Sequence, residues 1–182
     1  MYATTYADTL NLVTQLGARH PSPALPSRLD QLFVYLTSTA LDAALVEDDI
    51  WALWMHNPHH RAAEALDKAA TDIAAHRFDI AETRLVMLLR ACPNYAEAWN
   101  KRATLYYLLG RDEESVRDIH RVLELEPRHF GALSGLGEIC LAAGDEAAAR
   151  LAFQTALRLN PHLEAVRDEI DKLEAPARTD TA

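Results

Sequence analysis

The sequence contains few of the residues that define several common protein classes. Of its 182 residues only 2 are cysteine, and neither Cys92 nor Cys140 lies in a CxxC motif or a Cys/His zinc spacing. This excludes a disulfide framework, and we expect two reduced, partly buried thiols. No stretch approaches the roughly 18 to 20 consecutive apolar residues that cross a membrane, so the sequence predicts no membrane span.

Positive charge is also scarce. The chain has 18 Lys and Arg against 27 Asp and Glu, a formal net charge of -9. This balance argues against nucleic acid or an anionic membrane as the main partner. The sequence begins without an early positive charge, and no signal-peptide core follows. These features predict a cytoplasmic protein.

The motifs of common catalytic and cofactor sites are missing as well. There is no GxSxG, no Cys/His arrangement for nucleophilic catalysis and no phosphate loop. Gly131, Gly135 and Gly137 belong to a helical pattern rather than to a strand-loop-helix unit. We expect Gly137 to fill a small-residue position, and Gly131 and Gly135 to keep an inner surface open. The sequence therefore predicts no enzyme and no cofactor.

One histidine-rich segment contains a dense group of metal-type ligands, His56, His59 and His60. Pro58 interrupts the segment, and the spacing matches neither HExxH nor a zinc-finger pattern. We expect a solvated turn between two helices. A metal-binding protein that uses the three histidines remains a less favoured alternative.

What the sequence does contain is an internal repeat. Pro93, Pro127 and Pro161 are spaced by 34 residues, and Gly110 and Gly144 keep the same interval. Rows of 34 residues that start at positions 62, 96 and 130 align further columns of similar size. These columns are Ala69, Ala103 and Gly137; Ala81, Ser115 and Ala149; Leu85, Ile119 and Phe153; and Leu89, Leu123 and Leu157. Such a period indicates a stacked repeat architecture.

The middle row predicts the structure of one unit. Trp99, Ala103 and Tyr106 fall at i, i+4 and i+7, which places them on one face of a helix. Gly110 ends that helix, and Pro127 ends a second one. Small residues at the facing positions let the two helix axes approach to about 8 to 10 Å. Each row is therefore expected to form a helix-turn-helix unit.

These residues resemble the tetratricopeptide repeat (TPR) family, whose pattern has Trp, a small residue, Tyr, Gly, a second small residue, a bulky apolar residue and a closing Pro. The row 96–129 matches nearly throughout. The row 130–163 has Leu133 and Cys140 in place of Trp and Tyr, and the row 62–95 has Asp72 and His76 in place of Tyr and Gly. The resemblance covers about residues 62 to 174. This part of the chain is similar to short bacterial three-repeat proteins.

The resemblance implies an all-α fold, a right-handed α-solenoid with a helical cap at each end. We expect the third repeat to be followed by a capping helix that has Leu163, Val166, Ile170 and Leu173 on one face. Helices are expected at about 27–37 and 41–55, the second packed on the first repeat. A further hypothesis places a short helix, about residues 4–16, in the protein's own groove or that of a neighbouring copy. The expected segments are 1–26 (N-terminal, with a Pro-rich linker), 27–61 (N-terminal cap), 62–95, 96–129 and 130–163 (repeats 1 to 3), 164–174 (capping helix) and 175–182 (tail).

The resemblance also implies a concave face, lined by the first helix of each pair, that binds a peptide or an amphipathic helix. We therefore expect a protein-interaction scaffold whose partner has some basic character, because two carboxylates face inward. A homo-oligomeric structural protein is the alternative. The expected groove residues are Glu97, Asn100, Lys101, Thr104, Tyr107, Ser134, Glu138 and Leu141.

The best-known ligand mode of the family is a clamp of Lys, Asn and Arg side chains that binds the acidic C-terminus of a chaperone. The corresponding positions in this sequence are Leu66, Ala70, Lys101, Gly131 and Gly135. None of them matches the clamp pattern, so the sequence predicts that the protein is not a carboxylate-clamp co-chaperone.

Overall fold

The computed structural model describes residues 6–23, 25–38 and 42–175, and within these ranges the regular structure is helical throughout. The helices are α1 (Tyr6–Gln15), a 3-10 turn η1 (Leu16–Ala18), α2 (Arg28–Leu36), α3 (Ala43–Met55), α4 (His60–Ala74), α5 (Phe78–Ala91), α6 (Ala96–Leu108), α7 (Asp112–Leu125), α8 (Phe130–Ala142), α9 (Glu146–Leu159) and α10 (Glu164–Glu174). Most of the expected C-terminal tail lies outside the described residues. None of the described helices is long and apolar enough to span a bilayer.

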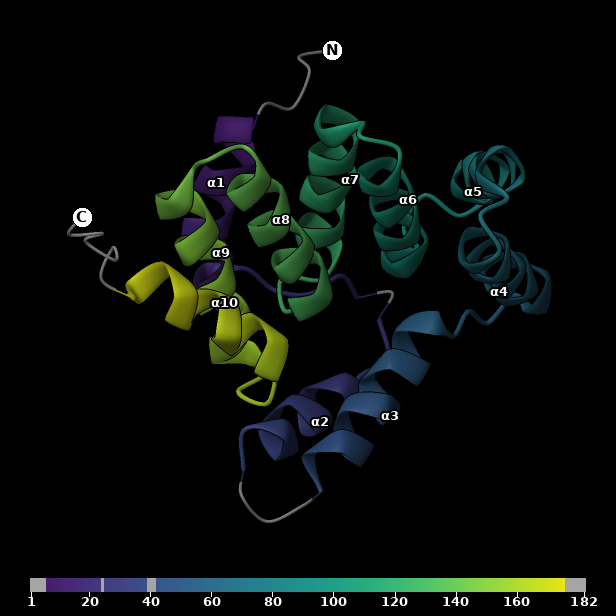
Figure 1. Cartoon of the computed structure of the whole chain (residues 1–182). Coiled ribbons are helices and arrows are strands. Elements are labelled where there is room, and N and C mark those ends of the chain that lie inside the picture. The colour runs from purple at the N-terminus through teal and green to yellow at the C-terminus, as the bar shows by residue number, and fades with distance from the viewer. Residues whose placement is uncertain (1–5, 24, 39–41, 176–182) are drawn as a thin grey trace.

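Helices α4 to α9 form three antiparallel pairs that stack side by side (Figure 1). Small residues allow the two helices of a pair to approach closely. An ideal Cβ on Gly137 would lie 2.3 Å from the ring of Phe153, and the Ser115 hydroxyl donates to the carbonyl of Ala103 at 2.8 Å. The expected all-α helical repeat fold is confirmed.

The turn inside each pair needs the same unusual backbone. His76, Gly110 and Gly144, which are 34 residues apart, have φ values of 55°, 68° and 78°. This left-handed conformation costs a residue with a Cβ about 1 to 2 kcal/mol, whereas glycine adopts it freely. The first repeat therefore carries a strained residue at a position where the other two repeats have glycine.

We expect His76→Gly to raise the free energy of unfolding by about 1 kcal/mol, because it removes this strain. Urea denaturation followed by circular dichroism measures the change. Ala75→Gly is the matched control, since the neighbouring φ of -89° is open to any residue and glycine there only adds unfolded-state entropy. Equal effects of the two substitutions would contradict the assignment of strain to residue 76.

The C-terminal end of the stack is covered as expected. Val166 and Ile170 of α10 are buried in the main hydrophobic cluster, and Arg150 of α9 donates to the carbonyl of Leu173 at 3.3 Å. Helix α10 therefore covers the apolar face that repeat 3 would otherwise expose to solvent.

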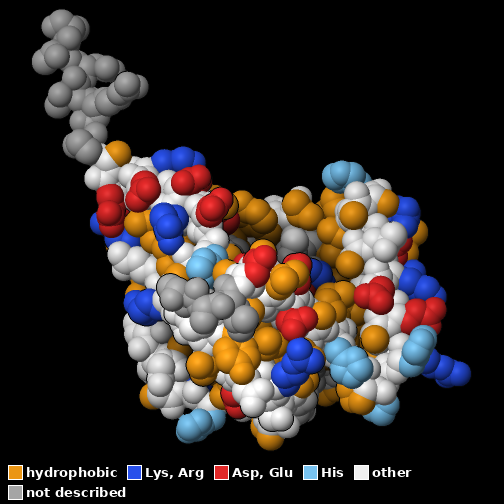
Figure 2. Space-filling model, turned by 90° about the horizontal axis from the view of Figure 1, so that it is seen from below, with side chains coloured by type: hydrophobic (Ala, Val, Ile, Leu, Met, Phe, Trp, Pro, Cys, Tyr) orange, Lys and Arg blue, Asp and Glu red, His pale blue; other side chains and the backbone are white. Residues whose placement is uncertain are grey.

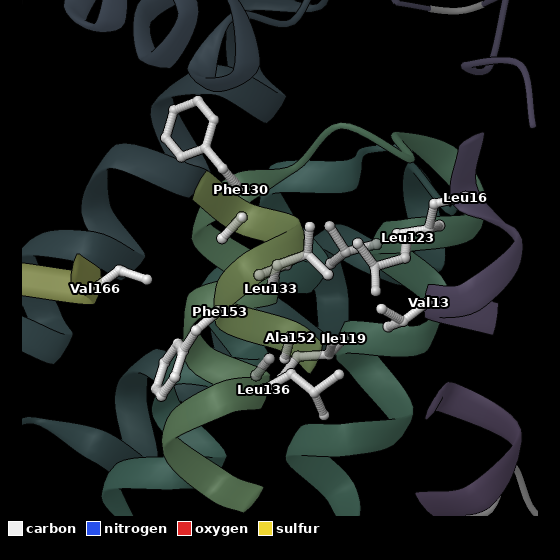
Figure 3. Packing of buried hydrophobic residues seen from close by; sticks show 14 of the residues in the cluster. Val13, Leu16, Ile119, Leu123, Phe130, Leu133, Leu136, Ala152, Phe153 and Val166 are labelled. Atoms are coloured by element: carbon white, nitrogen blue, oxygen red, sulfur yellow. The ribbon is translucent and has the colours of Figure 1, made fainter. Parts of the chain in front are cut away.

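Helix α1 lies on the second helices of repeats 2 and 3, not in the concave groove. Figure 3 shows Val13 and Leu16 beside Leu123 of α7. The hydroxyl of Tyr6 donates to Asp145 at 3.3 Å. The hypothesis that residues 4–16 enter the protein's own groove is wrong for the described part, because the apolar side of α1 fits the gap between α7 and α9.

The N-terminal hairpin, formed by α2 and α3, lies beneath repeats 2 and 3 (Figure 1). Its polar contacts reach the loops that join repeats. Arg128 pairs with Asp30 at 2.6 Å, and Asn160 donates to Glu47 at 2.8 Å. Phe33 packs against Phe130 with ring centroids 6.3 Å apart. The expected packing of the second helix on repeat 1 holds only for the C-terminal end of α3, where the hydroxyl of Tyr95 donates to the carbonyl of Met55, because the other aromatic and charged partners of the hairpin lie in the later repeats.

Candidate binding surface

The first helices of the three pairs, α4, α6 and α8, supply the inner surface of the stack. Seen from below, the molecule has a hollow between a lobe on the α10 side and a lobe on the α4 and α5 side (Figure 2). Hydrophobic side chains are visible in and beside this hollow. The eight residues expected to line a groove all lie on α6 and α8, and the structure divides them into a buried and an accessible set.

Glu97 belongs to the buried set, with an exposed fraction of 0%. One carboxylate oxygen lies 3.0 Å from Nζ of Lys101. The other accepts from Asn100 at 3.1 Å and from Nε2 of His129 at 2.9 Å. The expectation that Glu97 faces an open groove is wrong, because His129 and the hairpin cover it. The polar ends of the Asn100 and Lys101 side chains both contact this carboxylate, so they are largely unavailable to a partner.

The hydrogen bonds around His129 define the state of this cluster. Its Nδ1 accepts from the backbone N–H of Ala132 at 3.1 Å, so the network assigns the ring proton to Nε2, which donates to Glu97. Burial alone would raise the pKa of Glu97, but the hydrogen bond from His129 and the charge of Lys101 hold the pKa below its usual value. Glu97 is therefore an ionised carboxylate that joins α6 to the start of α8.

Two tryptophans of α3 lie against this cluster, Trp54 buried and Trp51 partly buried. Trp54 stacks on His129, with ring centroids 4.0 Å apart and planes 8° from parallel. Trp51 lies over the start of α8, where an ideal Cβ on Gly131 would be only 2.6 Å from its Cη2 atom. The missing side chain of Gly131 thus makes room for Trp51, and Gly131 and Gly135 also line the open cavity between α6 and α8.

A cavity of about 110 Å³ lies between α6 and α8, and we call it the central groove; of the accessible set, Thr104, Tyr107 and Glu138 line it, and Ser134 and Leu141 do not. Tyr107 is 38% exposed at the edge of the groove, and its hydroxyl has no partner among the described residues. Ser134 donates to the carbonyl of Phe130 at 2.9 Å. The groove residues of the central cavity are Asn100, Ala103, Thr104, Tyr107, Ser115, Ile119, Gly131, Ala132, Gly135, Glu138 and Ile139.

Glu138 is the charged group of the central groove. It is half-buried, and no Lys or Arg in the described ranges lies within ion-pair distance of it. Burial raises the pKa of Glu138, and the nearby negative charge of Glu169 raises it further. The positive charge of Lys172, which pairs with Glu169, opposes this increase only in part. Leu141, the last of the expected groove residues, is partly buried against the main cluster. The groove therefore holds one carboxylate that forms no salt bridge among the described residues.

The three histidines of the candidate metal site do not converge. The backbone N–H of His59 donates to the side chain of Asn57 at 3.0 Å, which fixes a turn between α3 and α4. In the part of the chain that the structure describes, no group of three or more His, Cys, Asp or Glu side chains is placed to hold a metal ion. The metal-site alternative therefore has no geometric support.

Comparison with known proteins identifies the class. Models of the tetratricopeptide repeat match residues 96–129 and 113–164. A TPR repeat-containing protein of Rhizobium etli is 31% identical over 157 residues, which cover 85% of this chain and 77% of that protein. The chain therefore belongs to the tetratricopeptide repeat family.

Two further similarities are more distant. Tetratricopeptide repeat protein 37 of Xenopus laevis is 34% identical over 64 residues, 35% of this chain and 4% of that protein. A structure of the first TPR of Spaghetti (RPAP3), bound to the HSP90 peptide SRMEEVD, superposes with a TM-score of 0.60 at 19% identity. That likeness covers 65% of this chain and 94% of the other and shows a shared fold.

Sequence reasoning missed the buried aromatic cluster over Glu97. The residues that were not predicted are Trp51, Trp54 and His129, which come from α3 and from the loop before α8. One signal was present, since a glycine at position 131 inside a helix often marks close approach of another chain segment. The sequence did not indicate which segment approaches.

Proposed function

We propose that the protein is an interaction scaffold that binds an extended peptide or an amphipathic helix of another protein in the central groove. TPR proteins generally mediate protein-protein interaction, and the observation that carries the proposal is the presence of Tyr107 and Glu138 in the lining of one cavity. The Tyr107 ring is 38% exposed and the Glu138 carboxylate forms no salt bridge among the described residues, so both groups are available to a partner. Such a pair is suited to a partner with an aromatic or aliphatic anchor and a nearby Lys or Arg.

We further propose that the protein does not use the carboxylate clamp. At the clamp positions Leu66 is buried, Gly131 carries no side chain and has no room for one beside Trp51, and Lys101 is paired with Glu97. A free acidic C-terminus would meet Glu138 rather than a group of positive charges. The HSP90 peptide bound by the Spaghetti domain is therefore a suitable negative probe.

TPR folds are generally non-enzymatic, and we propose that this chain has no catalytic activity.

The test compares the wild type with Tyr107→Ala/Glu138→Gln. Crosslinking in native extract and mass spectrometry identify the partner, and titration calorimetry then measures its affinity for both proteins. We expect the double variant to bind at least 10-fold more weakly, about 1.4 kcal/mol, with an unchanged circular dichroism spectrum. Binding should also weaken as the pH falls through the raised pKa of Glu138, because protonation removes the charge that attracts the partner.

The matched control is Tyr35→Ala/Glu113→Gln, which changes the same residue types on the exposed surfaces of α2 and α7. It should bind like the wild type. Unchanged partner affinity of the groove variant would refute the central groove as the binding site. Micromolar binding of the peptide SRMEEVD would show that a clamp-like mode operates despite the missing residues.

A further inference from the structure

The first repeat presents an uncovered end face, formed by one side of α4 and α5. The positions of this face are Ala62, Ala65, Leu88 and Ala91, with counterparts Ala96, Trp99, Val122 and Leu125 in repeat 2 and Phe130, Leu133, Ala156 and Leu159 in repeat 3. In repeat 2, Trp99 donates its indole N–H to the carbonyl of Pro93 at 2.9 Å, so this side faces the preceding repeat. The same columns thus form the interfaces inside the stack.

The end face is apolar; Ala62 and Leu88 are buried within repeat 1, whereas Ala65 is partly exposed and Ala91 is exposed. The end face borders a cavity of about 820 Å³ lined mostly by apolar side chains. At its edge Ile80 is 50% exposed and Met87 is 66% exposed. Their counterparts in repeat 2 are Glu114 and Arg121, both charged. Solenoids normally cover such terminal faces with a polar cap. The N-terminal hairpin contacts repeat 1 only near Met55 and Tyr95, and no residue of α2 or α3 lines the cavity at the end face.

We propose that the end face is covered by the same face of a second copy of the chain, in a two-fold symmetric dimer. A two-fold axis crossing α5 near Thr83 sets the two α5 helices antiparallel. Ile80 of each copy then meets Met87 of the other, because the two residues lie seven positions, about 10.5 Å, apart on one stripe. The contact therefore buries four exposed apolar side chains, Ile80 and Met87 of each copy.

Charge complementarity at the two ends of α5 favours this occupant, and Arg84, which lies beside the proposed axis, is already paired with Asp72 at 3.1 Å. Helix α5 carries Asp79 in its first turn and Arg90 in its last turn. In the antiparallel arrangement Asp79 of each copy lies toward the end of the other helix that holds Arg90, so each end of the contact pairs opposite charges. The helix dipoles are also antiparallel, which adds a favourable term.

The remaining segments of this chain are poorly placed to cover the end face. Helices α1 and α10, which adjoin the terminal residues, pack on repeats 2 and 3 (Figure 1). In an isologous contact each copy contributes the same end face, and no end face remains exposed after the contact forms. Assembly therefore stops at the dimer and forms no filament.

The first test is the mass in solution, measured by sedimentation equilibrium of the full chain from about 1 to 200 µM, a range that spans typical dimer constants. We expect the wild type to approach twice its chain mass of 20.3 kDa. Ile80→Glu/Met87→Glu should raise the dimer dissociation constant at least 10-fold. The control Val34→Glu/Leu45→Glu changes side chains of α2 and α3 that are 65% exposed in both cases, and it should remain dimeric.

A second test does not depend on destabilising the contact. Thr83→Cys in a Cys92→Ser background places a thiol next to the proposed axis, where a disulfide between copies can form if the two Cα atoms are about 4.4 to 6.8 Å apart. We expect a covalent dimer under mild oxidation, and none from Val34→Cys in the same background.

A wild type that stays monomeric throughout this range would overturn the proposal, and so would a dimer that is unaffected by Ile80→Glu/Met87→Glu. Recovery of a foreign protein on the end face in place of the dimer would overturn it equally. The groove variant Tyr107→Ala/Glu138→Gln should remain dimeric, so loss of partner binding and loss of dimerisation are distinguished.

Discussion

Replacing Trp54 by alanine is expected to lower the free energy of unfolding by about 4 kcal/mol. The side chain is 2% exposed and stacks on His129, with Phe130 at a ring distance of 5.0 Å. Its loss leaves a cavity between the N-terminal hairpin and repeat 3. Urea denaturation followed by circular dichroism measures the change. Fluorescence is less suitable, because the substitution removes one of the tryptophans that give the signal.

Trp54→Phe is the matched control for this substitution. The indole N–H of Trp54 is buried without a hydrogen-bond partner in the described structure, which costs free energy that phenylalanine does not. Phenylalanine keeps most of the ring contact, so its effect should be about 1.5 kcal/mol or less. An alanine effect below about 1 kcal/mol would show that the hairpin is not integral to the fold.

Glu97→Ala is expected to destabilise the protein by about 3 kcal/mol. Asn100 and His129 lose their common hydrogen-bond acceptor in a buried site, and Lys101 loses its ion-pair partner. Glu97→Gln should cost less, because the amide oxygen can still accept a hydrogen bond. Glu113→Gln, an exposed change on α7, should have an effect within about 0.5 kcal/mol.

The contribution of Glu97 also depends on pH. Its folded pKa lies below the usual value of 4.5, so the folded state favours the ionised form. The stabilisation is therefore fully present above that value and is lost as the pH falls through the lower folded pKa. The stability difference between wild type and Glu97→Gln should shrink over this acidic range. A constant difference from pH 7 down to about pH 2 would contradict an ionised Glu97.

Several groove residues were predictable because they follow from position in the repeat. Tyr107 and Glu138 occupy inner-face positions of their rows, and the structure places both at one cavity. Glu97 occupies an equivalent position but is fully buried. The difference comes from residues outside its own repeat, since His129 and the α3 tryptophans cover it. The position of a residue in its row thus predicts which way its side chain points. It does not predict which other segments cover that side chain.

The sequence by itself determined the helical repeat. A period of 34 residues, the turn glycines at 110 and 144 and the closing prolines are local properties, because helix ends depend on backbone preferences within a few residues. The amphipathic pattern of the last helix likewise identified the C-terminal cap, Val166 and Ile170 included.

Only the tertiary structure decided which surfaces remain open. The N-terminal hairpin and α1 are amphipathic, and their sequences are compatible with several apolar partners. Contacts such as Trp54 on His129 and Val13 near Leu123 join residues far apart in the chain, and they are selected by shape and by charged partners such as Asp30 and Arg128. For that reason the hairpin covers Glu97 in the groove and leaves the end face of repeat 1 exposed.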